Sequence, residues 1–337
     1  MTLKQIATEL NLSFSTVSKA LRDSHEISES TKKLVLAKAK ELNYQVNPFA
    51  SSLRKQKSKT IAVVIPEVVN DFFGPVINGI ESIAQEKGYH VLIYLTHEDM
   101  KKEVAITKIL QNGRVDGVLI SISEQTSDAM HLQELEEKEI PLVFFDRVVE
   151  HMDSPKVTTD DYNSGANATE HLIENGCKRI AFLSISQSLS ISNKRMNGYR
   201  SALTKHNLPI DDSLVINFTG NDLTDKELIR QLLKSPARPD GIFASVEKLA
   251  IETYEICEEL QLKIPADVKV ICFSNLKTAG LLSPSMTTIT QPAYEIGREA
   301  AAILFKLVEK KGHHFLLEKT VINSKLVERN STRKTDS

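Results

Sequence analysis

Apolar runs of four to seven residues recur along the chain from Thr60 onward, and they limit the possible folds more than any other feature of the sequence. Strands that are apolar at every position are typical of parallel sheets buried on both faces. Seven such runs can be distinguished, at 61–65, 90–95, 117–120, 142–145, 179–183, 241–244 and 268–273. The segments between them are amphipathic: on one side of a predicted helix over 72–87 lie Val76, Ile77, Ile80, Ile83 and Ala84. Alternating strands and helices predict doubly wound α/β architecture, and since one sheet usually has about 4–6 strands, we expect two such parallel-sheet lobes.

The first 45 residues have a different pattern, which predicts three short helices. Helical spacing of apolar residues gives each helix a buried side. Ser13 is expected to cap the second helix, because a serine hydroxyl can accept a bond from an unpaired backbone N–H, and the third helix is expected to begin near Ser28. The apolar residues expected to face the core of this all-α head are Leu3, Ile6, Ala7, Leu10, Val17, Ala20, Leu21, Leu34, Val35, Ala39 and Leu42.

Charge is distributed unevenly between the head and the rest of the chain. The net charge of the whole chain is −2. Residues 1–59 contain 11 Lys/Arg and 5 Asp/Glu, so this segment is +6 and the remainder is −8. A basic head on an acidic body indicates a polyanionic partner for the head alone.

Several classes of protein are disfavoured by the sequence. No apolar run approaches the ~20 residues of a membrane span, and the first residues do not have the pattern of an export signal, so we expect a cytoplasmic protein. The three cysteines, Cys177, Cys257 and Cys272, have no paired spacing and are expected to be reduced core residues. The common phosphate-binding, nucleophile-elbow and zinc-protease motifs are absent from the sequence. We therefore expect neither an enzyme nor a cofactor or metal.

Residues 2–21 have the pattern of a helix-turn-helix. Ala7 is small where two helices would cross, Leu12 would fill the turn, and Val17 would pack the second helix on the first. The start of that second helix is the part that meets base edges in the major groove. Residues expected on its outer face are Phe14, Ser15, Ser18 and Lys19, while Ser13 and Thr16 would donate to phosphate oxygens.

With these motifs the sequence resembles the lactose-repressor (LacI/GalR) family of bacterial transcription regulators over nearly its whole length. The segments that carry the resemblance are 2–21, 27–33, 41–44, 47–54, 60–66, 144–147, 287–292 and 296–297. The resemblance implies a regulator, expected to be a repressor, that binds a pseudo-palindromic double-stranded DNA operator as a homodimer and responds to a small effector. The effector is expected to be a sugar or sugar derivative.

The resemblance also implies a division of the chain. The expected parts are a DNA-binding domain at 1–46, a hinge helix and linker at 47–59, an effector-binding and dimerisation module at 60–330, and a flexible tail at 331–337. The module would resemble periplasmic sugar-binding proteins, with an N-lobe at 60–160 plus 292–321 and a C-lobe at 161–290 plus 322–330. In the hinge, Leu53 would wedge into the minor groove, where an apolar side chain can unstack a base step. The other hinge residues expected at the DNA are Asn47, Ala50, Ser51 and Arg54.

Small molecules bind α/β sheets at the carboxyl ends of strands, in the crevice between lobes. Residues expected to bind the effector there are Phe72, Phe73, Asp146, Arg147, Asp161, Arg195, Glu247, Ser274, Asn275 and Gln291. Arg195 lies where the family has an effector-binding arginine, whose fork can grip paired hydroxyls or a carboxylate. An alternative for Asp146 and Arg147 is an ion pair between the lobes.

Two segments depart from the family pattern. Residues 244–247 read Ala-Ser-Val-Glu where the family usually has alanine-asparagine-aspartate, and 273–275 read Phe-Ser-Asn where a sugar-binding aspartate usually follows the strand. Ser274, Asn275 and Glu247 would substitute, or the ligand differs in kind. Two other functions stay open: a body that responds to a partner protein, and a solute-binding protein, against which the helix-turn-helix argues.

Overall fold

The computed structural model describes residues 2–42, 44, 58–218, 222–309 and 318–334. The chain forms two compact units, Met1–Ser58 and Lys59–Ser337. None of the helices in these described ranges is long and apolar enough to cross a membrane.

The first unit contains the three expected helices, α1 (Leu3–Glu9), α2 (Phe14–Ala20) and α3 (Glu29–Glu41). The capping prediction is confirmed: Ser13 Oγ accepts from the Thr16 backbone N–H at 3.0 Å. The third helix begins after Ser28 as expected, and Ser28 Oγ caps it by accepting from the Thr31 backbone N–H at 3.3 Å. The helices enclose a small core formed by Ile6, Ala7, Val17, Ala20, Val35 and Ala39. The prediction that Leu34 faces this core is wrong. Leu34 is 52% exposed, because the stripe of α3 that contains Val35 and Ala39 already covers the core.

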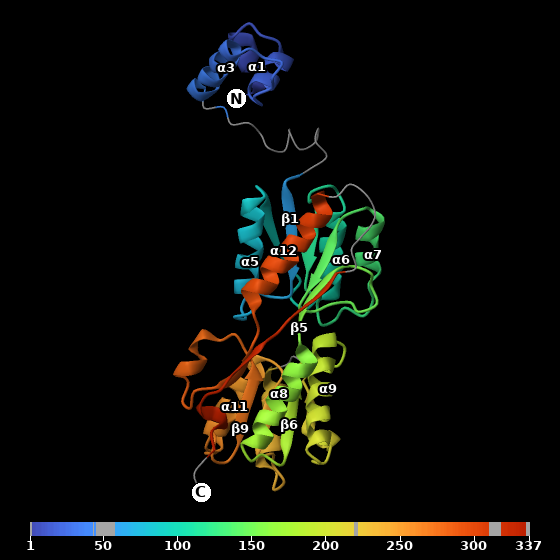
Figure 1. Cartoon of the computed structure of the whole chain (residues 1–337), viewed down its shortest axis with the longest axis vertical. Coiled ribbons are helices and arrows are strands. Elements are labelled where there is room, and N and C mark those ends of the chain that lie inside the picture. The colour runs from blue at the N-terminus through green and yellow to red at the C-terminus, as the bar shows by residue number, and fades with distance from the viewer. Residues whose placement is uncertain (1, 43, 45–57, 219–221, 310–317, 335–337) are drawn as a thin grey trace. The chain divides into compact units, whose positions relative to one another are not determined.

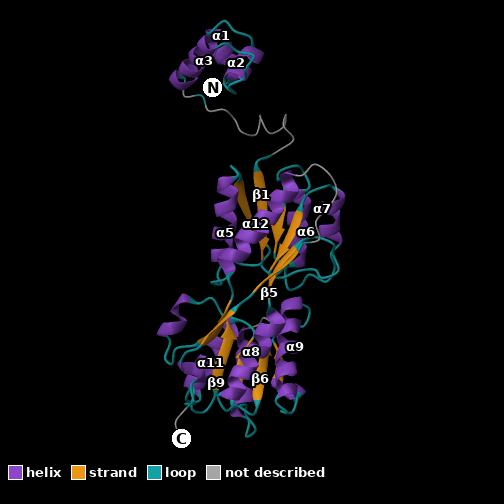
Figure 2. Cartoon of the chain, in the orientation of Figure 1, coloured by secondary structure: helices purple, strands orange, loops and turns teal. Residues whose placement is uncertain are grey.

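The second unit has the two predicted lobes, which Figures 1 and 2 show as two sheets flanked by helices. In the N-lobe the strand order is β11-β5-β4-β3-β1-β2, and every pairing is parallel. Its strands are β1 (Thr60–Ile65), β2 (His90–Leu95), β3 (Val118–Ile120), β4 (Leu142–Phe145), β5 (Lys156–Thr159) and β11 (Lys319–Ile322). Its helices are α5 (Phe73–Glu86), α6 (Met100–Leu110), α7 (Met130–Glu137) and α12 (Ala293–Glu309).

The C-lobe has strand order β12-β10-β9-β8-β6-β7, parallel except for the antiparallel pair β10–β12. Its strands are β6 (Ile180–Ser184), β7 (Val215–Asn217), β8 (Gly241–Ala244), β9 (Lys269–Phe273), β10 (Thr287–Thr290) and β12 (Lys325–Val327). Its α-helices are α8 (Asp161–Glu174), α9 (Ser190–Lys205), α10 (Asp222–Lys234) and α11 (Glu247–Glu259). Its short 3-10 turns are η1 (Asp212–Leu214), η2 (Lys277–Leu281) and η3 (Asn330–Thr332).

Burial on both faces explains the continuous apolar runs. In β1, Ile61 packs with α5 and α12 on one face, whereas its neighbour Ala62 packs with α6 and α7 on the other. In β8, Phe243 packs with α8 and α9, and Ile242 packs with α10 and α11. Alternate residues of a strand point to opposite faces. Because helices cover both faces of these strands, the residues of the run are apolar on both.

Strand β2 is an exception to this pattern. It lies at the edge of the N-lobe sheet, and Leu92 and Ile93 are 40% and 46% exposed. The expectation of a strand buried on both faces is therefore wrong for β2, because the helices on the two faces of the sheet cover this edge strand only in part.

The chain passes between the lobes three times. It leaves the N-lobe after β5, returns after β10 and leaves again after β11. The connections are short: Asp160 joins β5 to α8, Gln291 and Pro292 join β10 to α12, and Asn323 and Ser324 join β11 to β12. These three connectors lie beside the carboxyl ends of β5, β10 and β11.

One pair of helices in each lobe crosses at glycines. A Cβ on Gly297 of α12 would lie 2.1 Å from the Val76 carbonyl oxygen of α5, and a Cβ on Gly198 of α9 would lie 2.1 Å from the Tyr162 carbonyl oxygen of α8. Gly79 and Gly165 make the reciprocal approaches, at 2.2 and 2.5 Å. Only residues without a Cβ allow the two backbones to come this close. The motifs around 196–199 and 296–297 are therefore helix-packing features.

The C-terminal segment departs from the expected tail. Ser331 and Thr332, placed in a flexible tail by the sequence, are 0% and 1% exposed. Ser331 Oγ donates to the Val270 carbonyl of β9 at 2.6 Å, and Thr332 Oγ lies 2.8 Å from His171 Nε2. The tail prediction is wrong for these residues, because their hydroxyls bond to groups inside the C-lobe.

The cysteine prediction is confirmed. Cys177, Cys257 and Cys272 are free and buried. Burial raises the pKa of Cys177 and of Cys257 to about 12, so both thiols are protonated near neutral pH and act as core residues.

Candidate functional site

The first turn of α2, the predicted recognition helix, is open to solvent. Phe14 is 46% exposed and Ser15 is exposed beside it. The Ser13 and Thr16 hydroxyls lie 2.8 Å apart at the helix N-terminus. The structure therefore leaves these four side chains accessible, as a helix that reads a groove requires.

The next turn of α2 is more enclosed. Ser18, expected on the outer face, is 6% exposed. This expectation is wrong because α2 packs against both α1 and α3, so two of its sides are covered. Lys19 forms an ion pair with Glu26, and this partner lowers the pKa of the Glu26 carboxyl. A bound polyanion would compete with Glu26 for the Lys19 ammonium.

The hinge residues expected at the DNA lie outside the described residues. These are Asn47, Ala50, Ser51, Leu53 and Arg54. Their roles stay predictions.

Nine of the ten residues expected to bind an effector line one cavity of about 60 Å³ in the second unit. The N-lobe side contributes Phe72 and Phe73 at the start of α5, and Asp146 and Arg147 directly after β4. The C-lobe side contributes Arg195, Glu247, Ser274 and Asn275, and Gln291 belongs to a connector. The cavity thus lies at the carboxyl ends of strands from both sheets, which is the usual ligand position in α/β proteins.

Asp161, the tenth residue, does not line the cavity but holds Arg195 in place. Arg195 Nε donates to Asp161 Oδ1 at 2.8 Å, and Arg195 Nη1 donates to the Ser245 carbonyl at 2.7 Å. The guanidinium carbon lies 3.7 Å from the centre of the Phe273 ring. Arg195 and Asp161 are both 2% exposed. Three contacts therefore fix the arginine fork before any ligand arrives.

Asp146 is a buried carboxylate with weak partners. The Ser121 hydroxyl and the Gln291 amide approach its two oxygens at 3.5 Å. Burial raises the pKa of Asp146 to about 6, although Arg147 and Arg195 oppose the shift. Its backbone φ is 58°, in the left-handed region. A charged side chain on a strained backbone is costly to hold and is typical of a functional position.

The C-lobe side chains bond among themselves and to the connector. Asn275 donates to the Gln291 carbonyl at 2.7 Å and accepts from the Gln291 backbone N–H at 3.2 Å, so its amide fixes the β10–α12 connector. Ser274 Oγ donates to the Glu247 carboxylate. Ser274 and Glu247, expected as substitutes for the family's sugar-reading groups, are therefore adjacent in the cavity.

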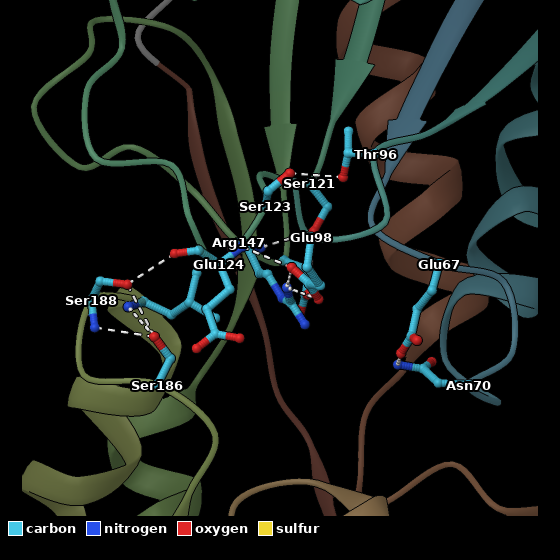
Figure 3. Close-up of polar contacts among 12 residues, drawn as sticks. Glu67, Asn70, Thr96, Glu98, Ser121, Ser123, Glu124, Arg147, Ser186 and Ser188 are labelled. Atoms are coloured by element: carbon cyan, nitrogen blue, oxygen red, sulfur yellow. Dashed lines mark hydrogen bonds and ion pairs between the residues drawn. The ribbon is translucent and has the colours of Figure 1, made fainter. Parts of the chain in front are cut away.

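The alternative of an ion pair between the lobes is wrong for Arg147, whose partner belongs to its own lobe. Arg147 Nη1 bonds to both oxygens of Glu98, at 2.7 and 2.9 Å. Glu98 belongs to the loop between β2 and α6, in the same lobe. Figure 3 shows this pair beside Glu124.

Sequence reasoning missed the acidic side of the cleft. A second cavity, of about 570 Å³, shares Asn70, Arg147, Val246 and Glu247 with the first, and Glu67, Glu98 and Glu124 also line it. These three acids follow β1, β2 and β3, at the carboxyl ends of their strands. Asp146 was predicted because it directly follows an apolar strand. The same criterion, applied to every strand of the sheet, would have selected these three acids.

Family models match both units of the chain. Residues 2–47 match the model of bacterial regulatory proteins of the lacI family, and residues 169–332 match a periplasmic binding protein-like domain.

Curated relatives match almost the full length. The HTH-type transcriptional regulator DegA of Bacillus subtilis is 30% identical over 332 residues, 98% of each chain. The ribose operon repressor of Halalkalibacterium halodurans is 30% identical over 310 residues, 92% of this chain and 91% of the relative. The chain belongs to the lacI family of bacterial regulatory proteins. As a member of this family it is a DNA-binding regulator of transcription.

Solved structures of transcription regulators have the same fold. A complex of the transcriptional regulator CelR with cellobiose is 25% identical, covers 98% of this chain and 99% of its own, and has a TM-score of 0.72. A regulator from Enterococcus faecium with bound ribose is 26% identical, covers 82% of this chain and 100% of its own, and has a TM-score of 0.71. The lac repressor dimer bound to operator and an anti-inducer has a TM-score of 0.84 at 21% identity, with 99% of each chain covered, and supports the fold alone.

The two departures from the lacI-family pattern both lie at the cleft. Ser245 presents its backbone carbonyl to Arg195, and Glu247 lines both cavities. Ser274 and Asn275 line the inner one. The substitutions therefore change the chemistry of the cavity lining and leave the fold intact.

Proposed function

We propose that this lacI-family protein represses transcription by binding a pseudo-palindromic DNA operator as a homodimer, and that a small, hydroxylated, sugar-related molecule in the cleft between its lobes controls operator affinity. The relatives that bind ribose and cellobiose support this effector class. The protein would act as a cytoplasmic regulator, with no catalytic step.

One observation carries the proposal: side chains from both lobes meet in one cavity at the strand ends. Polar groups that could bind hydroxyls, such as Arg195, lie there beside apolar rings such as those of Phe72 and Phe73. A ligand that contacts both lobes binds differently to the open and closed forms, so it can shift the equilibrium between them.

The proposal is tested by selecting bound sequences from a random DNA pool and titrating the selected operator with and without sugars. Operator affinity should change with a ligand that calorimetry shows to bind the protein. If no metabolite alters operator affinity and only a protein from cell extract does, the proposed effector is wrong.

Lys19→Ala should relax the base preference at one operator position at a cost of about 1–3 kcal/mol. The reason is that Lys19 follows the exposed start of α2, with Phe14 and Ser15. Lys33→Ala removes the same charge from the exposed side of α3 and is the control. Binding is measured on the selected operator and its point variants. An equal loss on all sequences would show that Lys19 contacts phosphate only.

The edge strand β2 is the surface that we propose for the dimer. Leu92 and Ile93 are exposed there, and an apolar sheet edge needs a cover. Ile93→Glu should sediment as a monomer, because burying a carboxylate in an apolar interface is costly. Ile210→Glu is the control, since Ile210 is similarly exposed, at 47%, in the C-lobe. If Ile93→Glu remains a dimer, the interface is elsewhere.

Leu53 is proposed as the minor-groove wedge, with Asn47, Ala50, Ser51 and Arg54 placing the hinge against the DNA. Leu53→Ala should lose operator bending and specific affinity while keeping effector binding, because a methyl group is too small to unstack a base step. Bending is measured by energy transfer between dyes at the two DNA ends, with Leu53→Met as the control. Bending equal to that of the wild type would assign Leu53 to the linker.

A further inference from the structure

The outer part of the cleft contains more acidic than basic side chains. Seven carboxylates and three basic side chains line the cavity of about 570 Å³. Its volume is within the range of about 300–1,000 Å³ that is typical of small-molecule sites. The formal charge of this lining is −4, so the cavity attracts cations and repels anions.

Each of the three bases already has an acidic neighbour. Arg147 is bound by Glu98. Lys226 Nζ lies 2.5 Å from Glu255 Oε2, and Lys248 Nζ lies 4.0 Å from Glu252 Oε1. The bases therefore do not neutralise the remaining carboxylates.

Three of these remaining carboxylates, those of Glu67, Glu124 and Glu247, have hydrogen bonds from neutral side chains in the described part of the chain and form no ion pair within 4.0 Å there. The Asn70 amide lies 3.5 Å from Glu67 Oε1, and hydroxyls of Ser186 and Ser274 bond to Glu124 and Glu247. Figure 3 shows Glu67 and Glu124 on opposite sides of the Arg147–Glu98 pair.

Two of these carboxylates, those of Glu124 and Glu247, lie near a further carboxylate. Burial raises the pKa of Glu124, and the neighbouring Glu98 carboxylate adds to the shift, while Arg147 and the Ser186 hydroxyl oppose it. Burial likewise raises the pKa of Glu247, with a further contribution from Asp71. A cation among these carboxylates would relieve the repulsion.

A second observation, independent of the acids, indicates a ligand with oxygen atoms. Arg147 is 6% exposed and lines both cavities. Its Nε has no hydrogen-bond partner in the described part of the chain. A buried N–H without an acceptor is costly, and a hydroxyl or ether oxygen of a ligand in the cleft would satisfy it.

The cation is not expected to be a metal ion. Within the described ranges, no three His, Cys, Asp or Glu residues are close enough together to hold one. A metal ion needs its ligands close together, whereas an organic cation can carry its charge on one group of a larger molecule. Carboxylates that are spread over the cavity therefore suit an organic cation.

We propose that the effector is a hydroxylated, sugar-like molecule with a protonated amine, which lies among Glu67, Glu124 and Glu247 while a ligand oxygen accepts from Arg147 Nε. This inference rests on the proposed function, because it assigns a chemical class to the ligand of the same cleft. It also accounts for the glutamate at position 247.

The experiment is calorimetry on the full-length protein with matched pairs of probes: glucosamine and N-acetylglucosamine, galactosamine and N-acetylgalactosamine, and chitosan disaccharide and its diacetylated form. Each pair differs in the charge of its amine. At least one free amine should bind at least tenfold more tightly than its acetylated form, and its affinity should fall as salt is raised.

Glu124→Gln and Glu67→Gln should each weaken binding of that amine at least fivefold and leave the acetylated form unchanged. Glu174→Gln, an exposed acid at the end of α8, is the control and should have no effect. The amide keeps the size of the side chain, and thermal melting verifies the fold of each variant.

Two results would overturn the charge assignment: equal binding of both members of every pair, or no binding by any amine. Operator titration with neutral sugars separates this failure from failure of the proposed function. If a neutral sugar changes operator affinity, the cleft is an effector site whose ligand is uncharged.

Discussion

Arg195→Ala should lower the free energy of unfolding by about 3–5 kcal/mol, the usual cost of leaving one partner of a buried ion pair without the other. Arg195 and Asp161 are both 2% exposed, and their bond is 2.8 Å long. Burial already raises the pKa of Asp161 against the opposing effect of Arg195. Without the arginine, the Asp161 carboxylate would have to be buried unpaired or take up a proton. Chemical denaturation followed by circular dichroism measures the loss.

The control is the double variant Asp161→Asn/Arg195→Met, which removes both charges and retains side-chain volume. It should recover most of the stability that Arg195→Ala loses, while still failing to bind effector. A loss below about 1 kcal/mol for Arg195→Ala, the scale of an exposed ion pair, would show that water reaches Asp161.

Asp146→Asn should raise the free energy of unfolding at pH 7.5 by about 3 kcal/mol, the equivalent of a pKa near 6 in the folded state against 3.8 for the free side chain. The folded state binds the proton more tightly, so the wild type gains stability as the pH falls from about 6 to 4. Above pH 6 the buried charge imposes its full cost. The asparagine variant has no charge to bury and should lack this gain.

Denaturation curves at pH 4, 5, 6 and 7.5 measure both effects, and Asp153→Asn, at an exposed site, is the control. Identical pH profiles for Asp146→Asn and the wild type would mean that the Asp146 carboxyl is solvated. We expect the stabilised variant to bind effector more weakly, because a costly charge at a ligand site is commonly retained for function.

Local patterns predicted most of the strands and helices, because burial on two faces leaves a continuous apolar run. The errors concern residues whose exposure depends on contacts between segments that are distant in the sequence. Leu92 and Ile93 are apolar but exposed, since the order of strands in a sheet depends on the whole chain. Ser18 is polar but buried because two helices pack on α2. Ser331 is buried against the Val270 carbonyl. This partner is 61 residues away in sequence, so no local pattern could predict the contact.

Nine residues of the inner cavity could be predicted because they follow strands or match a family motif. The acids Glu67, Glu98 and Glu124 were missed, although they also follow strands. Their common position depends on β1, β2 and β3 being neighbours in the sheet. Asp161 was expected to bind the effector but does not line the cavity; it bonds to Arg195, which is on another helix, so this pairing could be assigned only from the structure.

The glycine crossings determine where this protein can bend. Main-chain atoms of α5 and α12 pack directly against each other, and so do those of α8 and α9. Neither helix pair can slide without a collision between these atoms. Each lobe must then turn as a stiff block, and any rotation is taken up in Asp160, in Gln291–Pro292 and in Asn323–Ser324. Asn275 and Asp160 brace two of these connectors, through the Gln291 backbone and the Ser324 N–H. Ligand binding in the cleft would therefore be transmitted as a change in the angle between the two lobes, with these five connector residues as the hinge.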